Sequence, residues 1–541
     1  MMKIRRMRTG SLMLAATVHM LSAQTPPNPP APSPSPETTI RVNANAPTTP
    51  FPHFWEQTFG SGRAILSLRE SYRDDLRTVK QVTDFNAVRF HGIFMDDVGL
   101  YDPNAHIQNP GQAAEAVSPG QSIYNFSYID QIYDGLLANH VHPFVELSFM
   151  PKKMASDPAA LHAFWYKQNV SPPKDYKLWD AMITAFTQHL IERYGIDEVA
   201  KWDFEVWNEP NLDFWAGKPA QSTYFELYDH TALAIKKVSD RLRVGGPSTA
   251  QAAWVAAFLQ HCKQNNIPVD FVSTHVYAND TAKDVMGTNE QIPRDRMVCR
   301  SVRKVHNEIS ASPFPDTPLI FSEYNASYAN EPDVTDSIYM GPWLADTISQ
   351  CDGLTESMSY WTFSDVFEEQ GVVRTPFYGG FGLLAEDDIP KPALNAFAML
   401  HQLGDRRIPV DSDAALATKE ADGSIVVALW NYAPPYGTGA TYTAPPANVG
   451  PAKTFHLKLE EVAPKISATI WRLDADHGNV IKTFDAMGRP AFPSRNQISQ
   501  LRVAGQPFPP QKIMVKDGTL NVTIPPQGLV VIKIGSDRPT H

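Results

Sequence analysis

The chain has 541 residues, 43% of them hydrophobic, which is more apolar material than one ordinary domain needs and excludes global disorder. The formal net charge is -11, and an acidic chain without a basic stripe is a poor candidate for binding nucleic acid. Beyond the N-terminus no apolar run is long enough to span a membrane. We therefore expect one large domain and one smaller domain, with no nucleic-acid partner and no membrane span.

The N-terminus has the pattern of an export signal. Four basic residues between positions 3 and 8 precede a short, mostly apolar segment at 11–20, and Ala23 is placed for cleavage. We expect a signal peptide over residues 1–23 and an exported protein, periplasmic or secreted. Residues 24–37 contain seven prolines, which favour extended polyproline II structure and cannot pack a core. This segment is expected to be a linker.

Residues 38–50 begin with an alternating segment, Thr38–Asn45, that predicts a β-strand. From residue 51 to residue 403, short apolar runs alternate with segments of helical spacing such as Trp179–Tyr194 and Tyr224–Val238. This alternation predicts an α/β fold, a (β/α)8 TIM barrel. A doubly wound open sheet is disfavoured because no glycine-rich phosphate turn follows the first strand. The predicted barrel strands are Ala87–Phe90, Pro143–Leu147, Trp202–Trp207, Phe271–Thr274, Leu319–Ser322 and Ser357–Trp361.

Residues 404–541 lose the helical spacing and contain short strands separated by turn-forming residues. This pattern predicts a C-terminal antiparallel β-sandwich domain. The strand at 38–50 is expected to join it, because chain ends often lie together. The predicted strands are Ile425–Trp430, Thr454–Leu459, Ser467–Leu473, Leu520–Ile524 and Leu529–Ile534.

The cysteines and histidines indicate no metal centre and no redox motif. The three cysteines, Cys262, Cys299 and Cys351, have no zinc-site or redox spacing. An exported protein could pair two of them, and the spacing does not say which; we favour small buried hydrophobic residues. The histidines are scattered and form no HExxH motif. We therefore expect neither a metal nor a cofactor.

The segment Trp202–Trp215 carries the strongest catalytic signal. An apolar strand ends in Asn208, Glu209 and Pro210, and the carboxyl ends of barrel strands face the active site. Tryptophans on both sides suit the apolar faces of a sugar, and an apolar wall raises the pKa of a nearby carboxyl group. A surface glutamate beside a packed tryptophan is the plain alternative. The pattern favours a general acid at Glu209.

A second strand, within Leu319–Tyr328, ends in another glutamate, Glu323. Glycoside hydrolysis commonly needs two carboxyl groups that flank the scissile bond. The separation of Glu209 and Glu323 fits barrel strands 4 and 7, which would bring the two together at one rim. The pair therefore predicts a glycoside hydrolase. A strand-end glutamate paired with an arginine is the structural alternative for Glu323.

Several segments together resemble glycoside hydrolase family 39 of the clan A barrels, and within it the bacterial β-xylosidases. The likeness runs from about Gly60 to Lys391. It implies a retaining, exo-acting enzyme with Glu209 as acid/base and Glu323 as nucleophile. The matching segments are Arg89–Gly92, Phe144–Lys153, Phe204–Asn211, Ser273–Tyr277, Ser322–Tyr328 and Tyr360–Glu369.

The same resemblance implies the residues that bind the sugar. Asn208 is expected to bond the 2-hydroxyl group, a contact that can strengthen in the transition state. Either Glu368 or Glu369 is expected to hold the distal hydroxyl groups, and the sequence does not choose between them. The other residues expected in or near the innermost subsite are His91, Phe149, His275, Tyr277, Tyr328 and Trp361.

The substrate implied by the resemblance is a β-xyloside or a xylo-oligosaccharide. The family also contains α-L-iduronidases and arabinose-releasing enzymes. A uronic acid needs a cationic partner, whereas the stretch Trp361–Glu369 is acidic, which argues against iduronic acid. Arabinose stays open as an alternative. A non-catalytic carbohydrate-binding protein is the competing class, and it is disfavoured because both glutamates are present.

Overall fold

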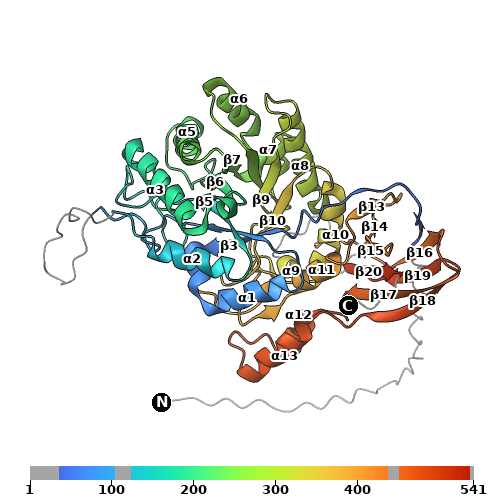
Figure 1. The fold of residues 1–541 in the computed structure, drawn as a ribbon. Helices are drawn as coiled ribbons and strands as arrows, with labels where there is room; N and C mark the ends of the chain where they lie inside the picture. Colours follow the sequence, from blue (N-terminus) through green and yellow to red (C-terminus); the bar gives the residue numbers. More distant parts are fainter. Residues whose placement is uncertain (1–35, 104–122, 436–449, 536–541) are drawn as a thin grey trace, which may run out of the picture. The chain divides into compact units, whose positions relative to one another are not determined.

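The computed structural model describes residues 36–103, 123–435 and 450–535 (Figure 1). The expected signal peptide and nearly all of the proline-rich linker lie outside these residues, so both stay predictions. Among the helices described, none has the length and apolar character needed to cross a bilayer.

The first large element is a closed barrel of eight parallel strands, in the order β10-β3-β4-β5-β6-β7-β8-β9 (Figure 1). The predicted TIM barrel is therefore confirmed; Glu209 follows its fourth strand, and Glu323 lies in its seventh. The strands are β3 (Thr58–Arg63), β4 (Ala87–His91), β5 (His142–Leu147), β6 (Asp203–Val206), β7 (Arg243–Thr249), β8 (Phe271–Tyr277), β9 (Leu319–Asn325) and β10 (Ser357–Tyr360).

Two of these strands, β3 and β7, were not predicted because glycines replace the apolar residues that mark a buried strand. The glycines have a packing reason. A Cβ atom at Gly60 in β3 would lie 2.2 Å from the Trp361 ring. One at Gly245 in β7 would lie 2.4 Å from the backbone oxygen of Phe271. The close approach of neighbouring groups, which only the fold reveals, excludes larger residues here.

Helices alternate with the barrel strands and surround them (Figure 1). The two predicted helices are α3 and α5; α3 starts where the Asp175 side chain accepts a 2.8 Å hydrogen bond from the Lys177 amide. The helices are α1 (Glu70–Lys80), α2 (Ser127–Leu137), α3 (Tyr176–Tyr194), α4 (Ile196–Val199), α5 (Ala220–Val238), α6 (Val255–Asn265), α7 (Ala282–Met286), α8 (Arg294–Ser310), α9 (Pro332–Thr335), α10 (Met340–Cys351) and α11 (Pro392–Leu400), with 3-10 turns η1 (Ala64–Leu68) and η2 (Ala250–Ala252).

The C-terminal part forms a separate, mostly antiparallel sheet in the order β1-β16-β19-β18-β17-β20-β15-β14-β13-β2. Two N-terminal strands belong to it: β1 pairs in parallel with β16, and β2 pairs with β13. Its strands are β1 (Glu37–Asn43), β2 (Thr49–Pro50), β13 (Arg406–Ile408), β14 (Ala415–Lys419), β15 (Ile425–Asn431), β16 (Lys453–Glu460), β17 (Lys465–Leu473), β18 (Gln511–Lys516), β19 (Thr519–Ile524) and β20 (Gly528–Ile534), and a small pair, β11 (Leu384–Ala385) and β12 (Ile389–Pro390), stands apart.

The central strand β15 is buried on both faces, which explains its continuous apolar sequence. Val426 and Ala428 pack into the core that also contains the barrel helices. Val427 and Leu429 point to the opposite face and pack into the interior of the C-terminal sheet itself. Because side chains alternate along a strand, β15 contributes to two separate cores at once.

The expectation that helical structure is absent after residue 404 is wrong. Helices α12 (Val480–Ala486) and α13 (Arg495–Gly505) lie between β17 and β18. Their apolar pattern is weak, since only Leu501 and Gly505 are buried in α13. A capping box between Ser494 and Gln497 marks the start of α13 instead.

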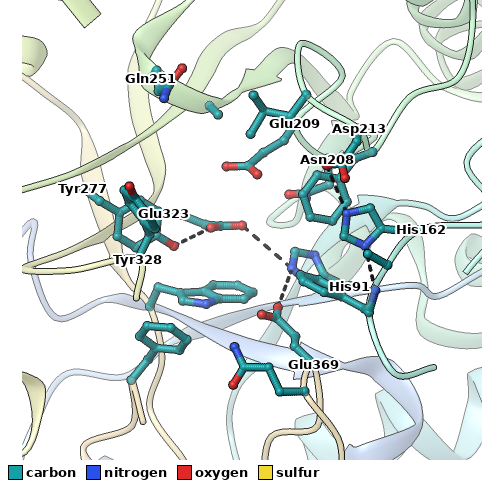
Figure 2. Close-up of a pocket in the computed structure, with 18 of the residues that line it drawn as sticks. His91, His162, Asn208, Glu209, Asp213, Gln251, Tyr277, Glu323, Tyr328 and Glu369 are labelled. Atoms are coloured by element: carbon teal, nitrogen blue, oxygen red, sulfur yellow. Dashed lines mark hydrogen bonds and ion pairs between the residues drawn. The ribbon is translucent and has the colours of Figure 1, made fainter. Parts of the chain in front are cut away.

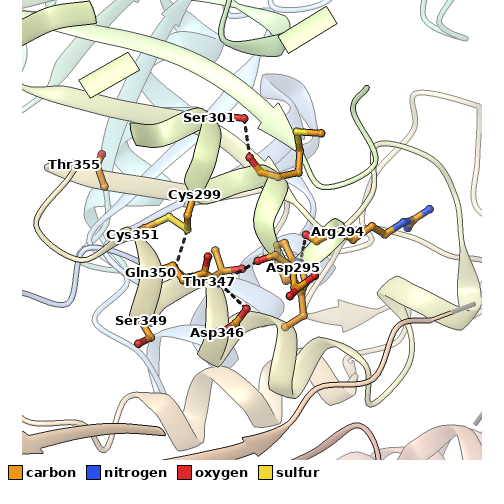
Figure 3. The surroundings of a disulfide bond; sticks show 12 residues. Arg294, Asp295, Cys299, Ser301, Asp346, Thr347, Ser349, Gln350, Cys351 and Thr355 are labelled. Carbon is orange, nitrogen blue, oxygen red and sulfur yellow. Dashed lines mark hydrogen bonds between the residues drawn. A yellow bond between two sulfur atoms is a disulfide. The ribbon is translucent and has the colours of Figure 1, made fainter. Parts of the chain in front are cut away.

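The preferred interpretation of the cysteines is wrong for two of the three. Cys299 in α8 and Cys351 at the end of α10 form a disulfide, with Cα atoms 5.2 Å apart (Figure 3). The two residues are 52 positions apart, and only the packing of α8 against α10 brings them together. Cys262 is free and buried, as expected for a small hydrophobic residue.

Candidate active site

The carboxyl ends of the barrel strands surround a cavity of about 750 Å³ (Figure 2). Acidic and aromatic side chains dominate its inner part, a combination suited to a sugar with its hydroxyl groups and apolar faces. The residues that line the cavity are His91, His162, Ala163, Phe164, Trp165, Lys167, Asn208, Glu209, Leu212, Asp213, Phe214, Ala250, Gln251, Tyr277, Asp280, Glu323, Tyr328, Trp361, Glu369, Gln370 and Phe381.

Glu209 stands just beyond the end of β6, where the backbone turns sharply. Its φ angle is 43°, in the left-handed region, and its amide donates a 2.7 Å hydrogen bond to the carbonyl oxygen of Ser248. Such a conformation in a residue other than glycine needs support from its surroundings. The bond to the end of β7 provides it and fixes Glu209 at the rim of the cavity.

Glu323 lies within β9 and is held by two donors. The Arg89 guanidinium donates from Nη1 to Oε1 over 2.6 Å, and the Tyr277 hydroxyl donates to Oε2 over 2.7 Å. Each carboxylate oxygen therefore accepts one hydrogen bond, which fixes the orientation of the group, and Figure 2 shows the bond from Tyr277. A carboxylate fixed and hydrogen-bonded in this way stays available in its ionised form.

The carboxyl groups of Glu209 and Glu323 face each other across the cavity (Figure 2). Oxygen atoms of the two side chains and a ring nitrogen of His275 all lie within 4.8 Å of one another. His275 Nδ1 is 3.0 Å from Glu209 Oε1. Burial and the neighbouring charges of Arg89 and His91 lower the pKa of His275 well below its ordinary value, so the ring is neutral and its tautomer decides which of the two groups donates this hydrogen bond.

The proton of this carboxyl pair belongs on Glu209. Burial and the negative charge of Glu323 raise the pKa of Glu209 well above its ordinary value. Burial raises the pKa of Glu323 as well, but the charges of Arg89 and His91 and the hydrogen bond from Tyr277 oppose that rise. One group is therefore an acid and its neighbour a carboxylate, the division of roles that acid-assisted displacement needs.

A network of buried charges lies beneath the pair, inside the barrel. Arg89 is fully buried and bonds Glu205 over 2.6 Å and Glu146 over 2.8 Å, in addition to Glu323. Its Nη2 also donates to the side-chain oxygen of Asn208 over 2.8 Å. The sequence analysis did not predict this network, although each of these charged residues interrupts an apolar strand. A charged residue in a buried strand requires a buried partner of opposite charge, and this requirement could have indicated the network.

The comparisons with known proteins agree with this geometry. The model of glycosyl hydrolases family 39 matches residues 38–520. The chain belongs to this family. The β-xylosidase of Geobacillus stearothermophilus is 37% identical over 482 residues, 88% of this chain and 90% of that protein. The β-xylosidase of Caldicellulosiruptor saccharolyticus is 34% identical and covers 84% of this chain and 88% of its own length.

Solved structures give the same relationship. The monomeric β-xylosidase from Caulobacter crescentus CB15 is 33% identical, with a TM-score of 0.81, and the match covers 92% of this chain and 100% of that one. The chain is thus a family 39 glycoside hydrolase, and its relatives share both the barrel and the C-terminal sheet.

Most of the predicted sugar-binding residues line the cavity of this family 39 enzyme. His91, Asn208, Tyr277, Tyr328, Trp361 and Glu369 do so, together with the two catalytic candidates. Phe149 does not; it is fully buried and packs edge-on against the Trp207 ring at 5.5 Å. His275 also does not line the cavity; its Nδ1 lies 3.0 Å from Glu209 Oε1 and 3.6 Å from Glu323 Oε1.

The surroundings of Glu368 and Glu369 differ. Glu368 is bound by Arg63 at 2.9 Å and Arg69 at 2.6 Å, which lower its pKa although burial opposes them, and it does not line the cavity. Glu369 does line it, 3.7 Å from His91 Nε2. Burial raises the pKa of Glu369 to about 8. Glu369 is therefore neutral at mildly acidic pH and can donate as well as accept hydrogen bonds.

The residues that line the outer part of the cavity were not predicted from the sequence. Its walls come from the loops at 162–167 and 212–214, where the His162 and Phe214 rings stack at 4.0 Å. Trp165 is half-exposed at the rim. These loops show no periodicity, so the sequence offered no signal beyond their aromatic content.

Two groups of side chains among the described residues are close enough to share a metal ion. One is the set of Glu209, His275 and Glu323, whose members are already engaged in hydrogen bonds to one another and to Arg89 and Tyr277. The other group is His53, Glu56, Asp84 and His401. It lies at the amino ends of the barrel strands, away from this cavity, and was not expected from the sequence.

Proposed function

We propose that this family 39 enzyme is a retaining β-xylosidase that releases xylose from β-xylosides or xylo-oligosaccharides. The carboxyl pair at the rim carries this proposal. Its oxygen atoms approach within 4.8 Å. Retaining enzymes hold their carboxyl groups about 5–5.5 Å apart, whereas inverting enzymes need about 6.5–9.5 Å to admit a water molecule. The similarity to the two β-xylosidases supports xylose as the sugar.

In the first step Glu209, protonated because its pKa is raised, gives its proton to the leaving glycosidic oxygen. The Glu323 carboxylate attacks the anomeric carbon, and the glycosidic bond breaks as the bond to Glu323 forms. In the second step Glu209 takes a proton from water, which attacks the same carbon and releases Glu323. Two displacements return the anomeric carbon to its original configuration.

The inner cavity supports a neutral sugar as the substrate. Asn208, oriented by its bond to Arg89, is proposed to bond the 2-hydroxyl group. Glu369 is proposed to hold the distal hydroxyl groups, and Trp361 to offer its face to the ring. Arg63 and Arg69, which could have paired with the carboxylate of a uronic acid, are engaged with Glu368 outside the cavity.

The experiment is a panel of aryl glycosides with the purified protein. The highest kcat/KM is expected for the β-D-xyloside, and proton NMR of the first-formed sugar should show the β-anomer. A higher value for the arabinoside would move the specificity to arabinose. An α-anomer as first product would overturn the two-step mechanism, and the absence of all hydrolysis would favour a binding protein.

We also propose that the protein is exported. The N-terminal signal pattern at residues 1–23 and the disulfide between Cys299 and Cys351 support this, because disulfides persist in oxidising compartments. Fractionation of expressing cells should place the enzyme outside the cytoplasm with the signal removed. Recovery of the intact chain from the cytoplasm, with both thiols reduced, would contradict export.

A further inference from the structure

The chain passes between the barrel and the C-terminal sheet at two neighbouring places. One is the segment 51–57, from β2 in the sheet to β3 in the barrel, and the other is the segment 401–405, from α11 to β13. β2 and β13 pair with each other, so the two crossings lie side by side. Four side chains meet there, and we call them the crossing cluster: His53, Glu56, Asp84 and His401.

The crossing cluster is organised around one buried carboxylate. Glu56 is fully buried, and its Oε1 lies 2.5 Å from His53 Nδ1 and 2.9 Å from His401 Nδ1. Burial raises the pKa of Glu56, but the hydrogen bonds from His401 and His53 outweigh burial and lower it below its ordinary value. Asp84, which precedes β4, is exposed and completes the set, and one ligand atom from each of the four lies within 4.8 Å of the others.

Two imidazole nitrogens and two carboxylate oxygens form a donor set that zinc accepts in tetrahedral geometry. Bonds of about 2.0–2.2 Å to these donors place neighbouring ligand atoms roughly 3.3 Å apart. The contacts in the crossing cluster bracket this value, from 2.5 Å between His53 and Glu56 to no more than 4.8 Å for the widest pair. The ligands also come from three separate segments of the chain, with His53 and Glu56 on one of them, as in metal sites that hold a fold together.

The surroundings of the crossing cluster favour a cation and give it access. His53 and Asp84 line a surface cavity of about 370 Å³, so an ion can reach them from solvent. Asp405 and Glu420 border the same cavity and add negative charge, although Glu420 is paired with Lys533 at 2.8 Å. The local field therefore attracts a divalent cation.

We propose that the crossing cluster is a structural binding site for a divalent transition metal, with Zn²⁺ as its expected occupant. The ion would cross-link both connections between the barrel and the sheet. The cluster lies before β3 and β4, at the amino ends of the barrel strands, whereas Glu209 and Glu323 are at the carboxyl ends. The site therefore acts on stability and takes no part in the chemistry at the rim.

Asp84 distinguishes a metal site from a simple pair of histidine–glutamate hydrogen bonds. Glu56 accepts from both histidines without help from Asp84, so a hydrogen-bonded clamp would not depend on the aspartate. A tetrahedral metal site would lose a ligand in Asp84→Ala. Because Asp84 is exposed, this substitution should leave the fold intact.

The experiment is a calorimetric titration of the untagged, chelator-treated enzyme with ZnCl₂ at about pH 7.5, where neutral histidines can bind. Wild type is expected to bind one equivalent, Asp84→Ala to bind at least about tenfold more weakly, and the double variant His53→Ala/His401→Ala to lose the site. At a hundredfold excess over Kd, Zn²⁺ should raise the Tm of wild type by about 2–3 °C.

Two control variants locate the ion. His230→Ala removes a histidine that is 3.0 Å from Asp180 and belongs to neither of the two candidate metal groups among the described residues, so it should bind like wild type. Glu209→Gln should also bind one equivalent of Zn²⁺, because the carboxyl pair of Glu209 and Glu323 is not the proposed metal site. Absence of a saturable equivalent in wild type, equal affinity in Asp84→Ala, or loss of binding in Glu209→Gln would each overturn the proposal.

Discussion

The interior of the barrel and the interior of the C-terminal sheet are built from different materials. Beneath the active site, Arg89 is buried among three glutamates on β5, β6 and β9. The core of the C-terminal sheet is built mainly from hydrophobic side chains, among them Leu457 and Ile532. Buried charges cost desolvation energy even when paired, whereas buried apolar area stabilises the fold directly. Substitutions in the first interior should therefore affect activity, alone or together with stability, whereas substitutions in the second should affect stability alone.

The largest effect is expected from Glu323→Ala. The variant loses the group that attacks the anomeric carbon, and kcat should fall by a factor on the order of 10⁴ or more. The unfolding midpoint should change little in comparison. Steady-state kinetics with an aryl xyloside, together with thermal unfolding, test this, and near wild-type turnover would remove Glu323 from the nucleophile role. A 2-deoxy-2-fluoro xyloside should label Glu323 and no other residue.

Glu209→Ala should reduce turnover of poor leaving groups by about 10²–10⁴-fold, because they need the proton that Glu209 supplies. An activated aryl xyloside leaves without protonation, so its first step should survive and the glycosyl-enzyme should accumulate. Azide needs no general base and should restore turnover, giving a glycosyl azide of retained configuration. Xylobiose and the aryl xyloside are compared with and without azide; equal loss on both, with no rescue, would make Glu209 structural.

Arg89→Met should affect both stability and activity. It leaves Glu146, Glu205 and Glu323 buried without their cation, and loss of one partner of a buried ion pair costs about 3–5 kcal/mol. Because Arg89 opposes the rise of the Glu323 pKa, its removal should move the acidic limb of the kcat/KM–pH profile to higher pH. Urea unfolding and the pH profile measure the two effects, and an unshifted limb would confine Arg89 to a purely structural role.

Leu457→Ala is the matched change in the other interior. Leu457 is fully buried in β16 and packs in the apolar core of the sheet, so its truncation should cost about 2–5 kcal/mol of stability. At temperatures where the variant is folded, kcat and KM should equal the wild-type values. A change in kcat without a change in stability would contradict the separation of the two interiors.

Glu369→Gln should have the smallest effect at mildly acidic pH, since the wild-type side chain is neutral there and glutamine preserves hydrogen bonding. The pKa of Glu369 is raised to about 8 in the folded enzyme. A raised folded-state pKa contributes stability at pH values below the unfolded pKa, and this contribution is lost as pH rises toward 8. The Tm of wild type relative to Glu369→Gln should therefore fall between pH 5 and pH 8, as measured by thermal unfolding. A constant difference would show that Glu369 is ionised throughout.

The sequence alone determined the architecture and was sufficient to predict the candidate catalytic pair. Six of the barrel strands carry short, mostly apolar runs, which burial in the barrel favours, so the alternation with helices was visible without any tertiary contact. Glu209 and Glu323 each end or interrupt such a run. Their residue type and position relative to a strand were local properties, and local properties can be read along the chain.

Other features depended on which segments become neighbours in space. β3 and β7 were not predicted because close contacts with Trp361 and Phe271, residues distant along the chain, require glycines in these strands. The disulfide between Cys299 and Cys351 likewise depends on contacts between distant segments. The same is true of the ion pairs that hold Glu368 to Arg63 and Arg69, which Glu369 lacks. It is also true of the crossing cluster, whose ligands span positions 53 to 401. The periodicity of apolar residues in a sequence indicates whether a residue is buried, but not which distant residue it contacts. The glycines, the disulfide, the ion pairs of Glu368 and the crossing cluster all depend on which residue is contacted.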